Sequence, residues 1–178
     1  MYYLRERLSL ENKKIAEGEN NMSTYGNEQK KIATQVDALQ NMLSFVEKLQ
    51  SYDEKTLTVS IKPGKWSIRE IVGHLYYWDR YLMESMIPRV AKDAVLPPFP
   101  NPAVYNRAAI ASLEGRKVSR IMERFITGRK FLIQQISFLD DQLTFNVRGS
   151  EETFTTMKFV DMFSEHDKHH QEQMERFL

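Results

Sequence analysis

Residues 67–91 read SIREIVGHLYYWDRYLMESMIPRVA, and this stretch indicates the fold class because it combines a helix start with a helical apolar face. Ser67 belongs to the residue types that cap helix N-termini, and Glu70 follows three residues later, as in a capping box. Apolar side chains then recur at intervals of three and four, the spacing of one helix face: Ile68, Ile71, Leu75, Trp78, Leu82 and Met86. We therefore predict an amphipathic helix over residues 67–91.

Three further stretches show the same apolar spacing and predict three more amphipathic helices: residues 27–50, 113–139 and 157–177. Residues 92–102 contain four prolines, which remove backbone donors, and they predict a loop that crosses the end of the molecule. Residues 103–112 fit either a helix or irregular structure. Residues 140–156 predict another connection, with a short extended piece at 143–147. Four principal helices with mixed short and long connections predict an all-α four-helix bundle.

The composition is that of a globular protein. The 178 residues suit one domain, and the net charge of +1 provides no broad attraction to nucleic acid or to an anionic membrane. Cysteine is absent, which excludes disulfides, thiolate ligands and a cysteine nucleophile. No apolar run approaches the roughly 20 residues that span a bilayer, and the N-terminus lacks a secretory signal. We expect a cytoplasmic protein with a small-molecule substrate, and neither nucleic acid nor a membrane as its partner.

The N-terminal residues 1–22 are polar and weakly patterned, and Met22-Ser23-Thr24 looks like an alternative start. One interpretation is an N-terminal extension ahead of a bundle domain over residues 23–178. The other is a native N-terminal helix that packs on the bundle or on a partner. The residues themselves favour neither.

All four histidines lie on two of the predicted helices: His74, His166, His169 and His170. At about 100° per residue, His166 and His170 both fall within about 60° of Phe163 on the inward stripe of the last helix. Residues four apart on a helix are neighbours, so these two imidazoles can bind one metal ion. His74 borders the apolar face of its own helix and can meet the pair across the bundle interior.

Three imidazoles would leave coordination positions open for water or substrate, as in catalytic rather than closed structural sites. Nitrogen ligands favour zinc, nickel or iron over magnesium or calcium. His169 points about 120° away from the stripe, so it is the poorer candidate, but a pairing of His166 with His169 stays open.

These features also have simpler explanations. An HxxxH pair often just covers a helix surface, and a single histidine such as His74 is more often a hydrogen-bonded core residue. Glu70 lies one turn from His74, and Glu165 and Asp167 flank His166, so they can form ion pairs or orient a ligand histidine. Three histidines that project into one bundle are nevertheless costly to bury without a partner.

Two segments resemble the DinB-like superfamily. KWSIREIVGHL (residues 65–75) is similar to that family's Trp-Ser pair, helix start and metal-binding histidine. HDKHHQEQM (residues 166–174) is similar to the C-terminal helix that supplies two more ligands at HxxxH spacing. The proline-bearing link fits as well, and the resemblance spans about residues 24–178. One departure concerns Gln171-Glu172-Gln173, where the family often has Gly-Gln or Arg-Gly-Gln. That departure affects substrate contacts rather than the metal triad.

The resemblance implies a bundle in up-down-down-up order, often homodimeric, with a three-histidine site that commonly holds nickel or zinc. Carried onto this chain, the ligands are His74, His166 and His170, and no residue is assigned as catalytic. Some relatives, among them bacillithiol transferases, are S-transferases with a low-molecular-weight thiol as cosubstrate, which would supply the sulfur that this cysteine-free chain lacks. We therefore expect a divalent-metal-dependent, thiol-dependent S-transferase that acts on small electrophiles. The alternatives are a metal-dependent hydrolase and a non-catalytic metal-binding or dimerising bundle.

Overall fold

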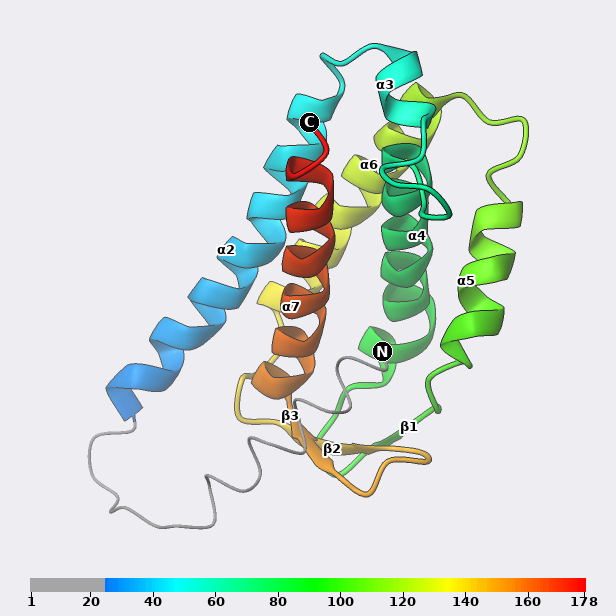
Figure 1. The fold of residues 1–178 in the computed structure, drawn as a ribbon. Helices are drawn as coiled ribbons and strands as arrows, with labels where there is room; N and C mark the ends of the chain where they lie inside the picture. Colours follow the sequence, from blue (N-terminus) through cyan, green and yellow to red (C-terminus); the bar gives the residue numbers. More distant parts are fainter. Residues whose placement is uncertain (1–24) are drawn as a thin grey trace.

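Four long helices form a bundle in the computed structural model, which describes the backbone of residues 25–178 and the side chains of residues 36–178. These helices are α2 (Tyr25–Leu49), α4 (Ile68–Tyr81), α6 (Val118–Ser137) and α7 (Thr156–Glu175). Figure 1 shows α2 and α7 running toward one end of the bundle and α4 and α6 running toward the other. The four-helix bundle in up-down-down-up order is therefore confirmed. The extension predicted over residues 1–22 and the domain boundary after it lie outside the described residues.

The start of α4 follows the prediction. Ser67 is the N-cap residue, and its hydroxyl accepts a hydrogen bond from the Glu70 backbone N–H at 3.3 Å. The Glu70 carboxylate in turn accepts from the Ser67 backbone N–H at 2.8 Å, which completes the capping box. This exchange fixes the first turn of the helix that carries His74.

The end of α4 comes earlier than the predicted residue 91. The α-helix gives way to a π-helical turn at Leu82–Met86 and then to a 3-10 turn at Ile87–Arg89. Pro88 accounts for the change, because it has no N–H to donate to the Glu84 carbonyl and its ring crowds that carbonyl. The Arg89 guanidinium donates to the Glu84 carbonyl oxygen instead, at 3.2 Å.

The connection between α4 and α6 must travel the length of the bundle, because these two helices run in the same direction. It carries a short strand, β1 (Val95–Leu96), and a helix, α5 (Pro102–Ala111), that packs beside α4 (Figure 1). The helical alternative for residues 103–112 is thus confirmed. The next helix, α6, begins at Val118 rather than at residue 113, because a left-handed turn at Gly115 (φ 68°) separates it from α5.

A small three-stranded sheet lies at one end of the bundle. Its strand order is β1-β2-β3, with β2 at Thr144–Val147 and β3 at Thr153–Thr155. β1 pairs with β2 in parallel, and β2 pairs with β3 in antiparallel register. The sequence predicted only an extended piece at 143–147, because strands of two to four residues are too short to show an alternating pattern. The short helix α3 (Glu54–Thr58) was not predicted either; Asp53 caps it by accepting from the Thr56 N–H at 2.9 Å.

The buried apolar side chains form two clusters, one toward each end of the bundle. On α4, α6 and α7 the first cluster includes Ile71, Leu75, Phe125 and Met174. The second includes Leu82, Leu132, Phe159 and Val160. Six buried polar residues form a layer in the middle part of the same helices: His74, Asp79, Arg129, Ser164, Asp167 and His170. Because buried polar groups need partners, this layer is the place to look for function.

Gly73, next to His74, lies where α4 passes closest to Leu113. A Cβ at this position would come within 2.4 Å of the buried Leu113 Cδ1. We expect Gly73→Ala to lower the free energy of unfolding by about 1–3 kcal/mol, the usual cost of overpacking. Gly128→Ala on α6 is the matched control, because its nearest neighbour would be Met83 Cε at 3.5 Å. This control should gain about 0.5–1 kcal/mol from helix propensity. Urea unfolding compares the two, and equal stability would contradict the close approach.

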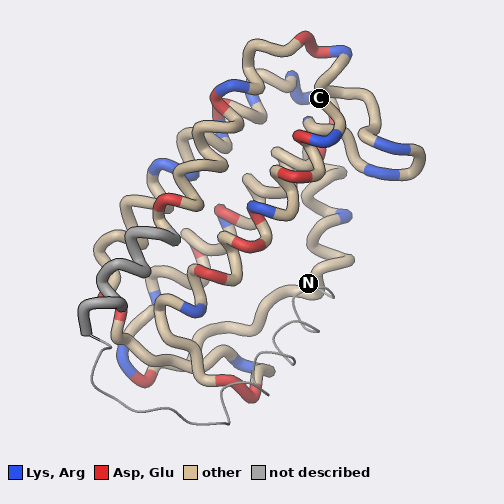
Figure 2. Tube along the Cα trace, turned by 60° about the vertical axis from the view of Figure 1, so that its left-hand side comes forward, with Lys and Arg blue, Asp and Glu red and all other residues tan. Residues whose placement is uncertain are grey.

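The surface carries interspersed charges of both signs, and Figure 2 shows acidic and basic positions alternating along the helices and loops. Among the described helices, none has the length and hydrophobicity that crossing a membrane requires. Two aromatic side chains near the end of α6 are exposed, Phe131 at 51% and Phe138 at 80%, so the apolar pattern of this helix extends beyond the core.

Candidate metal centre

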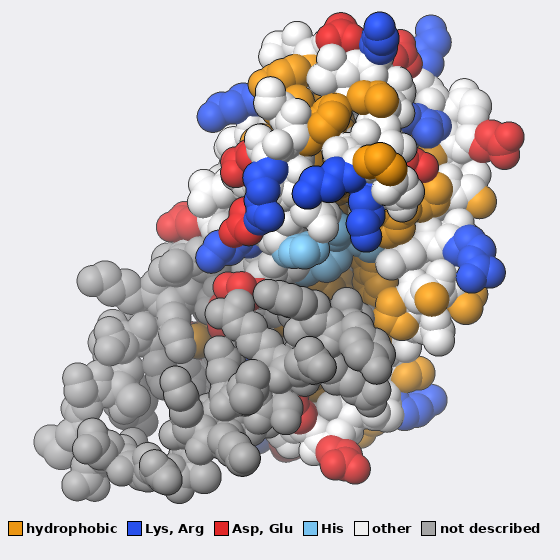
Figure 3. Space-filling view, in the orientation of Figure 1, with side chains coloured by type: hydrophobic (Ala, Val, Ile, Leu, Met, Phe, Trp, Pro, Cys, Tyr) orange, Lys and Arg blue, Asp and Glu red, His pale blue; other side chains and the backbone are white. Residues whose placement is uncertain are grey.

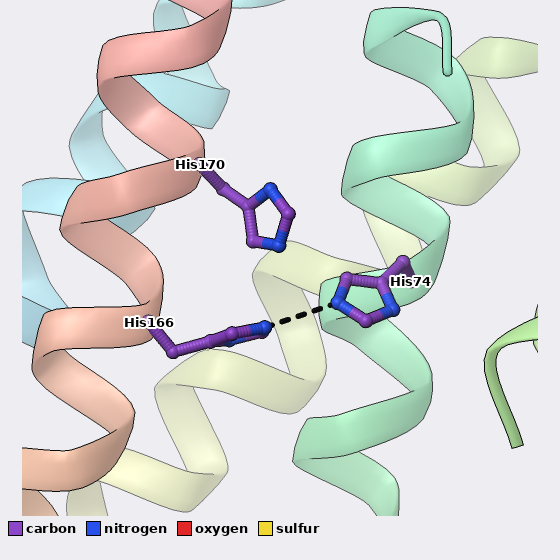
Figure 4. Close-up of side chains that lie close together, drawn as sticks. All are labelled: His74, His166 and His170. Carbon is purple, nitrogen blue, oxygen red and sulfur yellow. Dashed lines mark hydrogen bonds between the residues drawn. The ribbon is translucent and has the colours of Figure 1, made fainter. Parts of the chain in front are cut away.

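The three histidines singled out by the sequence meet inside the bundle. His74 comes from α4, His166 and His170 come from successive turns of α7, and their rings point toward one another (Figure 4). One ring nitrogen of each lies within 4.8 Å of those of the other two. His74 and His170 are buried, whereas His166 is partly exposed.

The spacing of the ring nitrogens suits a shared ion. The Nε2 atoms of His74 and His166 are 3.1 Å apart. Nitrogen–metal bonds of roughly 2.1 Å place two ligand nitrogens about 3.0 Å apart at an octahedral ion and about 3.4 Å apart at a tetrahedral one. A hydrogen bond between two neutral imidazoles has a similar length. Such a bond would involve two rings, whereas a metal site also uses the His170 ring, whose centroid is 4.6 Å from that of His166 and 5.0 Å from that of His74.

The three rings are held in the neutral form that ligates metals. Burial lowers the pKa of His74 to about 3 and the pKa of His170 to about 4. Burial, followed by the neighbouring histidines, also holds the pKa of His166 well below its usual value. Protons therefore do not compete for these nitrogens at neutral pH. A set of three neutral imidazoles fits zinc or nickel better than a hard ion such as magnesium.

Gln173 orients His170. Its Oε1 accepts a hydrogen bond from Nδ1 of His170 at 2.9 Å, which leaves the Nε2 lone pair of that ring free to bind a metal. The amide nitrogen of Gln173 donates to Nε2 of the exposed His169, also at 2.9 Å. His169 thus lies outside the cluster that His74, His166 and His170 form. The Gln173 side chain sits on the same stretch where the sequence departs from the family pattern.

The acidic residues proposed to orient ligands have other positions. The Glu70 carboxylate forms the predicted capping box with Ser67, and it makes no hydrogen bond to Nδ1 of His74. Glu165 is exposed on α7. Asp167 is buried and belongs to an ion-pair network that the sequence reading missed.

That network is the Arg129 triad, formed by Asp79 of α4, Arg129 of α6 and Asp167 of α7. Each of its three side chains is at most 5% exposed. The Arg129 guanidinium donates to both Asp79 oxygens, at 2.8 and 2.9 Å, and to both Asp167 oxygens. Arg129 therefore ties together α4 and α7, the two helices that carry the histidines. A cavity of about 10 Å³ is lined by His166 and all three members, so the triad lies beside the histidines.

The triad sets two carboxyl groups against one guanidinium. Burial raises the pKa of Asp79 to about 6, and Arg129 opposes that shift. Burial likewise raises the pKa of Asp167. Burial alone would lower the pKa of Arg129, but the two aspartates outweigh it and raise that pKa. The guanidinium therefore stays charged, and its hydrogen bonds to both aspartates offset the cost of burying it beside the neutral histidines.

The surroundings of the cluster are partly aromatic. The Trp66 ring lies 4.9 Å from that of His74 and stacks on that of His170 at 6.4 Å, centroid to centroid. Figure 3 shows histidine side chains at the surface in the middle of this face, with basic and apolar side chains around them. The three rings are therefore bordered by the apolar surface of Trp66, and of the three only His166 is partly exposed.

A four-helix bundle of this order, with histidines that converge from two of its helices, defines a class of helical proteins with a candidate metal site. The chain belongs to the DinB superfamily, whose family model matches residues 36–174. The resemblance found in the sequence is thereby confirmed, while the bacillithiol transferase subgroup stays a prediction.

One solved structure shows the same fold. The chain is similar to YfiT from Bacillus subtilis, described as a probable metal-dependent hydrolase with an unusual four-helix bundle topology. The TM-score is 0.61 at 13% identity, over 90% of each chain. At that identity the likeness establishes the fold alone. No curated protein sequence matches this chain.

Proposed function

We propose that the protein is a divalent-metal-dependent, thiol-dependent S-transferase that acts on small electrophiles, with His74, His166 and His170 as the metal ligands. The observation that carries the proposal is the convergence of three neutral imidazoles on one point inside the bundle. A small-molecule substrate and a cytoplasmic setting, where low-molecular-weight thiols are reduced, are parts of the same proposal.

A zinc or nickel ion held there would supply a Lewis acid that lowers the pKa of a small thiol bound to it. The chain's own residues do the rest of the work. Gln173 orients His170, and the Arg129 triad holds α4 and α7 at a fixed separation. Trp66 covers two of the imidazoles with apolar surface and excludes water from that side. Because the chain contains no cysteine, the sulfur must come from a cosubstrate.

The test is conjugation of a fluorogenic alkyl bromide, measured with zinc- or nickel-loaded protein and a panel of thiols that includes glutathione, cysteine, bacillithiol and mycothiol. We expect a rate that requires both the metal and one of the thiols. His170→Ala should lose at least about tenfold of that rate, since it removes a group that acts on the reacting centre. His169→Ala is the matched control and should keep the rate. Equal rates for the wild type and His170→Ala would contradict the proposal.

The second candidate is a metal-dependent hydrolase, and the description of YfiT is the observation that favours it. The same three histidines would then hold the metal ion, and water would take the place of the thiol as the nucleophile. Turnover of ester or amide substrates by the metal-loaded protein, unchanged by added thiol and lost in His170→Ala, would support this candidate over the transferase.

A further inference from the structure

His74 has one nitrogen that the cluster does not use. Its Nε2 faces His166, while its Nδ1 is buried without a hydrogen-bond partner. In the described part of the chain it is the one buried side-chain nitrogen or oxygen without such a partner. An unpaired buried polar group is costly, so a nearby acceptor would be used. Ligand histidines in proteins almost always donate their second ring N–H to such an acceptor.

Asn106 of α5 is placed to be that acceptor. Trp78, one turn after His74 on α4, donates its Nε1–H to Oδ1 of Asn106 at 3.0 Å. An indole N–H can only donate, so the amide oxygen, rather than the amide nitrogen, faces α4. The rings of His74 and Trp78 are 6.4 Å apart, centroid to centroid, and the Asn106 side chain that Trp78 bonds also interacts with His74. A carbonyl oxygen has two lone pairs, and the bond from Trp78 uses one of them.

The Asn106 side chain already interacts with the imidazole. Burial lowers the pKa of His74 and is the dominant effect, whereas a polar contact from the Asn106 side chain opposes that shift. The contact lacks the full geometry of a hydrogen bond at Nδ1. A bond from Nδ1–H of His74 to this oxygen is compatible with the one from Trp78, because the amide oxygen has a second lone pair.

We propose that Asn106 is a positioning residue, which holds His74 in the Nδ1–H form by accepting its proton and thereby leaves the Nε2 lone pair for a metal. This gives α5, which lies outside the four-helix bundle beside α4, a role at the metal centre (Figure 1). The expected effect of Asn106 on metal affinity rests on the proposed function. The expected effect of Asn106 on the tautomer of His74 does not depend on that function.

The test uses the full chain labelled with ¹⁵N and long-range ¹H–¹⁵N spectra of the histidine rings, first without metal and then with zinc. In the metal-free wild type we expect His74 to carry its proton on Nδ1. Asn106→Leu should shift His74 toward the Nε2–H form and weaken zinc binding about 10- to 100-fold. Asn106→Asp keeps the acceptor, so it should preserve the Nδ1–H form and bind zinc at least as tightly as the wild type. Arg107→Leu, an exposed neighbour on the same helix, controls for changes in α5.

Two results would overturn the proposal: a metal-free wild type with His74 protonated on Nε2, or an Asn106→Leu variant with the tautomer and zinc affinity of the wild type. The second result, with a wild type that binds zinc, leaves the proposed function intact. A wild type that fails to bind zinc but whose His74 tautomer depends on Asn106 would remove the proposed function and retain the role of Asn106.

Discussion

Arg129→Met should lower the free energy of unfolding at pH 7 by about 3–5 kcal/mol, because it leaves two buried carboxylates without their partner. The side chains of Asp79 and Asp167 are at most 5% exposed, so water cannot replace the guanidinium as their partner. The neighbouring Lys130→Met is the matched control. Lys130 is exposed and pairs with Glu47 at 2.9 Å, and the loss of an exposed pair costs about 0–1 kcal/mol. Chemical denaturation measures both variants.

The pH dependence of the Arg129→Met variant provides a second check. Without the guanidinium, the pKa of Asp79 and of Asp167 in the folded protein rises further above the unfolded value of 3.8. The folded state then binds more protons than the unfolded state, so the variant should regain stability as the pH falls from 7 toward 5. The triple variant Asp79→Leu/Arg129→Met/Asp167→Leu has no buried charge and should be far more stable than Arg129→Met at pH 7. A loss for Arg129→Met no larger than that for Lys130→Met would contradict the triad.

His170→Ala should weaken zinc or nickel binding by at least about a hundredfold, while His169→Ala should leave it within about threefold of the wild type. The reason is positional: His170 contributes to the cluster, whereas His169 is exposed and bonded to the amide of Gln173. Loss of a residue that merely supports a ligand costs 10- to 100-fold, so loss of a ligand should cost more. Competition with a chromogenic chelator measures the affinities.

Thermal unfolding gives the same comparison an independent readout. Zinc at about 100 times its dissociation constant should stabilise the wild type and His169→Ala by about 2.7 kcal/mol. His170→Ala should gain almost nothing at that concentration. If His169→Ala lost binding and His170→Ala kept it, the assignment of the ligands would be wrong.

The helices and the histidine cluster could be predicted from the sequence because both follow from helical periodicity. His166 and His170 share a stripe with Met174, and Ser67 with Glu70 marks the start of the helix that carries His74. Of the two roles open to Glu70, the structure shows the capping box, because a residue at the third helical position can reach back to the N-cap backbone N–H.

The sequence places charged residues of the Arg129 triad on inward helix faces, but helical periodicity alone does not say which of them pair. Arg129 lies about 40° from Phe125, and Asp167 lies about 40° from Phe163, so both are charged residues on inward stripes. Which charges pair depends on how the three helices pack against one another in the folded protein, and the pattern along any one helix does not show this. The sheet was predicted only in part, for a different reason. Strand β1 pairs with residues about 50 apart in the sequence, such as Leu96 with Val147, and all three strands are too short to show a local pattern.

Anomalous X-ray diffraction at the zinc edge, from crystals of the untagged protein grown with one equivalent of zinc, tests the central claim most directly. We expect one strong peak inside the bundle, about 2.1 Å from a ring nitrogen of each of His74, His166 and His170. The nitrogen at His74 should be Nε2. A peak at the exposed His169 alone, or no peak among the three rings, would contradict the claim that these histidines form a metal site.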